Sequence, residues 1–123
     1  MFEPLNLMGL AHARARHAAA QQAVVAQNVA NSDTPGYRAR DLTSFEDTFR
    51  SAGGRFGDLD TAHNAAERMN FRSIDAGGTS APNGNSVSLE AEMLRGIEAQ
   101  RAHSRAIRIY QSSLTIMRSA LGR

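Results

Sequence analysis

The carboxyl-terminal third of the chain carries an apolar pattern that is too long for a compact domain of this size. From Leu89 to Leu121, residues at alternating steps of three and four are mostly apolar, and no proline interrupts them. This spacing places them on one face of an α-helix, and Ser88 is suited to cap its amino end. A helix of about 34 residues would be ~50 Å long, whereas a compact domain of 123 residues has a radius of gyration of roughly 13 to 14 Å. The helix must therefore lie along another long helix or along other molecules.

The first part of the chain predicts a second long helix, from about Leu5 to Asn31. This stretch contains nine alanines and a single glycine, so its intrinsic helicity is high. The pattern of this helix alone is equally typical of an amphipathic helix in a globular core, but the length of the two helices favours packing of one on the other. Steps of three and four select the residues that we call the predicted seam: Met8, Ala11, Ala15, Ala18, Gln22, Val25 and Val29 in the first helix, and Leu89, Met93, Gly96, Gln100, His103, Ile107, Tyr110, Leu114, Met117 and Leu121 in the last.

We expect an all-α fold in which the two terminal helices pack as an antiparallel coiled-coil pair. Residues 1–31 and 88–123 would form one discontinuous coiled-coil domain, joined by a largely irregular segment, residues 32–87. Pairing Val29 with Met93 places Gln22 opposite Gln100, so that small residues of the first helix face large residues of the last. One shared stripe buries little surface against the entropy cost of ordering, so a lone subunit should be only marginally stable. Neighbouring copies are expected to cover the apolar residues off the seam: Leu10, Val24, Leu94, Ile109 and Ile116.

The part of the middle segment from residue 43 to residue 87 has a different composition. It holds six of the ten glycines and four of the five phenylalanines. Phe45, Phe49 and Phe56 lie around a Gly53-Gly54 break in a stretch that could form a short helix, and residues 68–75 could form a short strand. The phenylalanines could build a small separate core, or they could stay mobile until a partner covers them; the sequence leaves both alternatives open.

Just after the first helix the chain is predicted to change direction within a few residues. Asn31 is suited to the left-handed conformation that ends a helix, and Pro35-Gly36 fits the two central positions of a type II turn. Tyr37 comes next, and residues 38–42 alternate as a strand does. An ordinary helix-ending loop explains one Pro-Gly pair, but it explains less well why this segment is so densely specified.

The composition and the lack of several known motifs exclude several kinds of site. The chain has no cysteine, which removes disulfides, thiolate metal sites and cysteine nucleophiles. His12 and His17 are five residues apart, so they do not share a helix face as a metal-binding pair would. No phosphate-binding loop, nucleophile elbow or paired-acid motif is present. We therefore expect no catalytic site, metal or cofactor; the first residues also lack the pattern of a secretory signal peptide, and no run is long enough to cross a bilayer.

The charged residues are unevenly distributed along the chain. Residues 41–92 carry a net charge of −5 and residues 93–123 a net charge of +5, and all the non-histidine basic residues are arginines. Arg101, Arg105 and Arg108 share a helix face at i, i+4 and i+7. They could be a solvated stripe, or they could contact the acidic segment of a neighbouring subunit. Nucleic-acid binding is a third alternative, but it calls for base-reading or stacking side chains and a recognisable module that the sequence lacks.

Two stretches resemble a known protein family. Residues 30–37, Ala-Asn-Ser-Asp-Thr-Pro-Gly-Tyr, resemble the ANxxTPGY motif near the amino end of flagellar basal-body rod and hook proteins, and residues 40–42 resemble the continuation found in short, proximal-rod members. Residues 85–93 resemble the N-x-V-x-L-E-x-E-M start of the last helix in that group. The chain has no room for the large inserted domains of distal rod and hook members. The resemblance singles out these motif residues: Asn28, Ala30, Asn31, Thr34, Pro35, Gly36, Tyr37, Arg40, Asp41 and Leu42.

The resemblance implies a structural protein without catalysis. Such a subunit would polymerise with its own copies and with other rod proteins into the axial drive shaft of the flagellum. It would be exported unfolded through the flagellar type III apparatus without a cleaved signal peptide, and it would assemble in the periplasm. The implied partners include the basal-body adaptor and export-gate proteins, but no nucleic acid and no small-molecule substrate. From the residues alone, a soluble coiled-coil adaptor or regulator and an arginine-mediated nucleic-acid binder stay open as alternatives.

Overall fold

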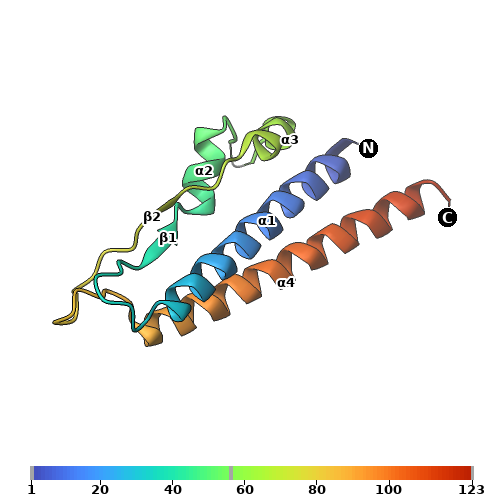
Figure 1. The fold of residues 1–123 in the computed structure, drawn as a ribbon. Helices are drawn as coiled ribbons and strands as arrows, with labels where there is room; N and C mark the ends of the chain where they lie inside the picture. Colours follow the sequence, from blue (N-terminus) through green and yellow to red (C-terminus); the bar gives the residue numbers. More distant parts are fainter. Residues whose placement is uncertain (1, 56, 123) are drawn as a thin grey trace.

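The computed structural model describes residues 2–55 and 57–122 of the chain. Within these ranges the elements are α1 (Phe2–Ala30), β1 (Arg40–Leu42), α2 (Phe45–Ser51), α3 (Leu59–Arg68), β2 (Ser73–Asp75) and α4 (Leu89–Ala120). They form three layers, with α4 on one side of α1 and the middle segment on the other (Figure 1). The central element is therefore α1, which contacts α4, α3 and β1.

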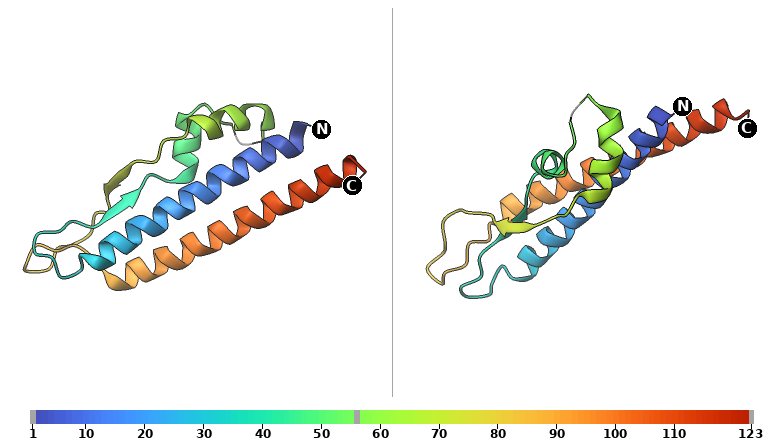
Figure 2. Two further views of the ribbon diagram at one scale, coloured as in Figure 1. Left: turned by 45° about the vertical axis from the view of Figure 1, so that its right-hand side comes forward. Right: turned by 90° about the horizontal axis from the view of Figure 1, so that it is seen from above.

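Two long terminal helices pack along each other, as the sequence predicted. The last helix begins directly after Ser88, whose hydroxyl accepts a hydrogen bond from the Ala91 amide at 3.3 Å and so caps the helix. Both ends of the chain lie at one end of the helix pair, and the loops that lead to and from the middle segment lie at the other end (Figure 2). The middle segment therefore folds back along α1.

The contact between α1 and α4 is built mainly from small side chains on both helices. On α1 it buries three members of the predicted seam, Ala11, Ala15 and Ala18. On α4 the buried residues are Glu92, Ala99, Ala102, Ala106 and Ser113. Alanine beside alanine lets two helix backbones approach closely, so the pair gains many weak backbone contacts in place of interlocking large side chains.

The predicted seam of α4 is therefore wrong by about one residue. The row that is buried has the same three-four spacing as the predicted row and lies directly beside it, so periodicity alone could not separate the two. Leu89, Met93, Gln100, Ile107, Tyr110 and Leu121 are exposed, and Leu114 and Met117 are half-buried. On α1, Gln22 and Val29 are exposed, while Met8 and Val25 are half-buried. The expected pairing of small with large residues and the expected Gln22–Gln100 layer do not occur, because both glutamines are exposed.

The middle segment contains a small core of its own, which decides between the two alternatives for its phenylalanines. Phe45 and Phe49 are buried with their ring centroids 5.9 Å apart, and Phe71 packs against the same cluster. The other buried members are Ala13, Ala62, Ala65, Ala66 and Met69. Because Ala13 comes from α1, this core fixes α2 and α3 on the long helix. The remaining phenylalanine of the segment, Phe56, lies outside the described residues.

Two short strands connect this core to the end of α1. The antiparallel pair of β1 and β2 aligns Arg40 with Asp75 and Leu42 with Ser73, so part of the predicted strand at residues 68–75 is confirmed. The start of that range instead ends α3, a helix that the sequence pattern did not predict. Its signals were present: Asp58 caps it by accepting a hydrogen bond from the Asp60 amide at 3.1 Å, and Ala62, Ala65 and Ala66 have helical spacing.

Candidate functional site

The densest polar network of the motif surrounds Asn28, in the last turn of α1. Asn28 is fully buried at 0 % exposure. Its amide nitrogen donates to the Arg40 carbonyl at 2.7 Å, and its amide oxygen accepts from the Arg40 amide at 3.0 Å and from the Tyr37 hydroxyl at 2.9 Å. The side chain thus pairs with both backbone groups of Arg40, as a neighbouring strand would. This contact fixes the first residue of β1 against the helix that precedes it.

The turn between Asn28 and Arg40 has the predicted type II form. The Tyr37 amide donates to the Thr34 carbonyl at 3.2 Å across Pro35 and Gly36, and Gly36 has a φ of +74°. Asn31, in contrast, does not adopt the predicted left-handed conformation, since no described non-glycine residue has a positive φ. Tighter turns end the helix instead: the Ser32 amide donates to the Val29 carbonyl at 3.2 Å, and the Thr34 amide donates to the Asn31 carbonyl at 3.1 Å.

The loop that precedes α4 holds this turn from the other side. Asn85 is buried, and its amide nitrogen donates to the Asn31 carbonyl at 2.8 Å and to the Thr34 carbonyl at 2.7 Å. The Ser86 hydroxyl accepts from the Ala39 amide at 2.8 Å, and the Ser86 amide donates to the Tyr37 carbonyl at 3.0 Å. These contacts hold the end of α1, the start of β1 and the loop that leads to α4 together. We call this arrangement of residues 28–40 with Asn85 and Ser86 the joint. Sequence reasoning singled out Asn85 by resemblance only, and it missed Ser86.

Close approach of two loops explains one glycine of the joint. The Gly36 amide donates to the Asn83 carbonyl at 2.9 Å. Gly84 has a φ of +85°, and a Cβ there would lie 3.2 Å from the Gly36 Cα. A side chain at this position would push the two loops apart, so only glycine fits at Gly84.

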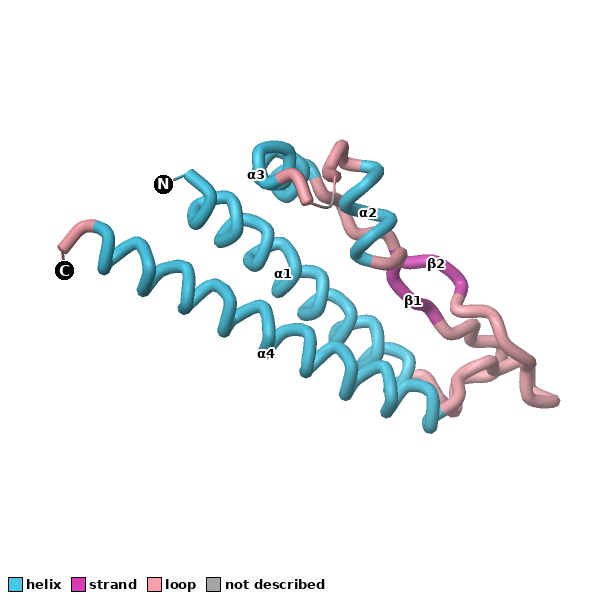
Figure 3. Tube along the Cα trace, turned by 180° about the vertical axis from the view of Figure 1, so that it is seen from behind, coloured by secondary structure: helices cyan, strands magenta, loops and turns pink. Residues whose placement is uncertain are grey.

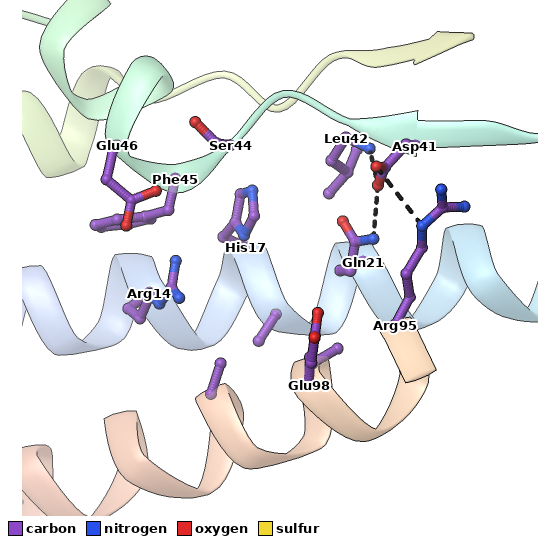
Figure 4. Close-up of a pocket in the computed structure, with 13 residues that line it drawn as sticks. Arg14, His17, Gln21, Asp41, Leu42, Ser44, Phe45, Glu46, Arg95 and Glu98 are labelled. Carbon is purple, nitrogen blue, oxygen red and sulfur yellow. Dashed lines mark hydrogen bonds and ion pairs between the residues drawn. The ribbon is translucent and has the colours of Figure 1, made fainter. Parts of the chain in front are cut away.

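Charged residues extend the joint toward the helix pair (Figure 4). Asp41 accepts a hydrogen bond from the Gln21 amide at 2.7 Å, and its carboxylate lies 3.8 Å from the guanidinium of Arg95. Arg95 also pairs at 2.8 Å with Glu92, which is 1 % exposed and whose Oε2 has no hydrogen-bond partner among the described residues. The motif residue Leu42 is buried beside them. Asp41 thus links β1 to both long helices.

A second ion pair lies at the exposed side of the strand pair. Arg38 donates to Asp75 at 3.2 Å and to the Ser80 hydroxyl at 2.7 Å. The hydrogen bond from Arg38 and, after it, the one from the Gly77 amide hold the pKa of Asp75 below its ordinary value of 3.8, although desolvation partly opposes them. Arg38 therefore fixes the segment before β1 to β2 and to the loop that follows β2.

The long helix α4 presents most of the exposed large apolar residues. Its main neighbour is α1, and no other element packs along its outer side (Figure 3). Among its outward residues, Leu94 is 58 % and Ile116 is 58 % exposed. Others are Leu89, Met93, Ile97, Ile107, Ile109, Tyr110 and Leu121. Arg101, Arg105 and Arg108 are also exposed, and none of them has a hydrogen bond or ion pair within the described ranges. Such a surface is typical of a helix that a partner covers.

Of the off-seam residues expected to need cover by neighbours, Leu94, Ile109 and Ile116 are exposed. Leu10 instead packs against the small core, and Val24 is half-buried. The remaining motif residues are also exposed: Ala30, which is the last residue of α1, and Thr34 and Pro35, which lie in the loop that follows.

The described residues contain no cluster of three or more histidine, cysteine or acidic side chains that could hold a metal ion. His17 is buried and bonds through Nε2 to the Thr43 carbonyl at 2.9 Å, with its ring edge-on to Phe45. In the same ranges, no helix combines the length and the apolar character that crossing a membrane requires.

Comparison with known proteins finds a family match over the part of the chain that contains most of the motif. Residues 11–38 match the family described as "Flagella basal body rod protein". That range includes the buried alanines of α1 and the joint as far as Tyr37. A curated relative, the flagellar basal body rod protein FlgB of Agrobacterium fabrum, is 30% identical over 111 residues, which cover 82% of this chain and 81% of the relative.

Proposed function

From the premise that this chain belongs to the family of flagellar basal body rod proteins, we propose that the joint and the helix pair together form its assembly unit. The chain is a structural subunit of the flagellar basal body rod, and it assembles with other rod proteins. The coiled-coil regulator and the nucleic-acid binder are not favoured by these similarities.

The terminal helices act as one discontinuous domain, residues 1–31 with residues 88–123, packed as an antiparallel coiled coil. The observation that carries the proposed assembly unit is the buried Asn28, whose side chain bonds the end of α1 to Arg40. Asn85 bonds the loop that leads to α4 to the same turn. A joint of this kind fixes the angle at which the middle segment leaves the helix pair. A rod that transmits torque needs subunits with few internal hinges, and the motif residues meet that need.

The subunit belongs to the proximal part of the rod and polymerises into the axial drive shaft. Similarity to FlgB over most of both chains supports this assignment. We further infer that the chain is exported through the flagellar type III apparatus without cleavage and assembles in the periplasm. There it contacts the adaptor and export-gate proteins at the membrane ring, and it has no catalytic activity.

Deleting the gene and imaging basal bodies by electron microscopy tests the function. We expect membrane rings without rods and cells that do not swim, both restored by the wild-type gene on a plasmid. Normal rods and normal swimming in the deletion strain would show that the proposal is wrong.

A further inference from the structure

A groove runs beside the helix pair, between α4 and the start of α2, with α1 as its floor (Figure 4). One part has a volume of about 320 Å³ and the adjoining part about 340 Å³, and Arg14, Phe45, Glu46 and Ala102 line both. Leu7, Leu10 and Ile109 line the second part, which is therefore largely apolar. A groove of this composition beside two helices suits a further amphipathic helix.

The charges that line the groove leave two carboxylates without a partner. Arg95 is paired with Glu92 and Asp41, and the guanidinium of Arg14 lies over the Phe45 ring, 4.9 Å from its centroid. Glu46 on α2 and Glu98 on α4 are exposed and make no hydrogen bond or ion pair with any described residue. The remaining titratable neighbours are His17, which bonds to the Thr43 carbonyl, and Arg105 at the edge. The groove thus offers an apolar floor with acidic sites at its sides.

The outer side of α4 has the complementary composition. Ile97, Arg101, Ser104 and Arg108 follow one another at steps of four, three and four, and together with Leu94 they form what we call the outer stripe. All five residues are exposed. Arg101 and Arg108 have no ion-pair partner in the described ranges, even though Glu98 is only three residues from Arg101. The outer stripe is therefore a basic helix face with apolar residues at one end.

Given the proposed rod function, we propose that the outer stripe of one copy binds in the groove of a second copy of this chain. Arg101 and Arg108 meet the unpaired carboxylates Glu46 and Glu98, and Leu94 and Ile97 cover apolar surface of the groove. The opposite charges of Arg101 and Arg108 on one copy and of Glu46 and Glu98 on the other select this occupant. Of the arginines in the groove, Arg14 lies over the Phe45 ring and Arg105 lies at the edge. The two surfaces face different directions on one molecule, so each copy uses both and the contact repeats head to tail. Head-to-tail repetition whose rotation does not close into a ring produces an open helical array, as a rod requires.

Cysteine cross-linking in assembled basal bodies tests the contact directly, because the chain has no cysteine of its own. Two versions are co-expressed in the deletion strain, one with Ser104→Cys in the outer stripe and one with Glu46→Cys at the groove. We expect a disulfide-linked dimer on oxidation when both versions are present, and none with either version alone. A disulfide needs Cα atoms within about 7 Å, so the readout is specific to direct contact.

Two outcomes of this experiment would overturn the inference. Dimers from Ser104→Cys alone would show that two outer stripes face each other. Equal cross-linking when Glu46→Cys is replaced by Thr79→Cys, in the exposed loop after β2, would show nonspecific collision.

Charge reversal gives a second, independent measurement. We expect Arg101→Glu with Arg108→Glu to lower self-association of the purified chain about tenfold at low salt. Glu46→Lys with Glu98→Lys should do the same. Mixing the two variants should restore association, because the acidic stripe of one then meets the basic groove of the other and the converse pair is also of opposite charge.

Combining all four changes in one chain should restore association as well, and failure of both restorations would overturn the inference. The control Arg55→Glu with Arg118→Glu reverses two exposed arginines elsewhere and should leave association unchanged.

The two levels of the proposal fail separately. Absence of the expected dimer in strains that still build rods and swim would refute the contact but not the rod function. Normal swimming of the deletion strain would refute the rod function itself.

Discussion

Replacing Asn28 by alanine tests whether the joint holds the molecule together. The change removes three hydrogen bonds at a side chain with 0 % exposure: Asn28 accepts from the Tyr37 hydroxyl and from the Arg40 amide, and it donates to the Arg40 carbonyl. A hydrogen bond contributes about 0.5 to 1.5 kcal/mol net, and a buried group left unpaired costs more, so we expect the free energy of unfolding to fall by about 2 to 4 kcal/mol. Tyr37→Phe removes only one of the three bonds and should cost about 1 kcal/mol.

The free energies are measured by urea denaturation with circular dichroism at each step. Trimethylamine N-oxide is added to every sample, since it raises the folded fraction of a marginally stable chain. Asn70→Ala, an exposed asparagine with no hydrogen bond in the described ranges, is the matched control and should change stability by less than about 0.5 kcal/mol. Should Asn28→Ala cost no more than Tyr37→Phe, the pairing of Asn28 with the Arg40 backbone would contribute nothing and the reasoning about the joint would be refuted.

Three further changes have expected outcomes. Gly54→Ala places a methyl group against the buried Phe49 ring and should lower the urea midpoint of unfolding. The new methyl group of Gly96→Ala meets only Val25, at 3.6 Å, so this change should raise the midpoint through better helix propensity. A shift of the midpoint in the same direction for both variants would contradict this reasoning. Arg95→Met leaves the buried Glu92 carboxylate unpaired and should lower the free energy of unfolding by about 3 kcal/mol. Glu92→Gln should lower it less in the same denaturation assay. Arg38 lowers the pKa of Asp75 in the folded state. The ionised Asp75 therefore contributes to stability above its unfolded-state pKa of 3.8, and this contribution is lost as the pH falls through the lower folded-state pKa. The stability difference between wild type and Asp75→Asn should therefore be constant near neutral pH and shrink in acid; an unchanged difference there would refute the assignment.

The position of the helix contact shows why part of the fold could not be read from periodicity. Met93 and Ile107 have the correct spacing for a buried row, but so do Ala99 and Ala106 beside them. Spacing gives the direction of a face only to within one residue, and the larger side chains suggested the wrong row. Packing chose the row of small residues because two backbones can approach closely there, which leaves the large residues of α4 outward.

The joint shows the same division between local and distant causes. Pro35 and Gly36 allow a type II turn by their own backbone preferences, and the sequence predicted that turn correctly. That Asn28 pairs with Arg40 could not be predicted, because the pairing depends on where the chain returns after the turn.

The sequence by itself determined two long helices, the cap at Ser88 and the turn at Pro35-Gly36, since each follows from preferences of residues close together in the chain. Only the tertiary structure decided which face of α4 meets α1, that α3 and the phenylalanines pack on Ala13, and that Asn85 holds the turn from the far end of the middle segment. These contacts join residues distant in sequence, and their free energy depends on shape and burial that no local pattern specifies.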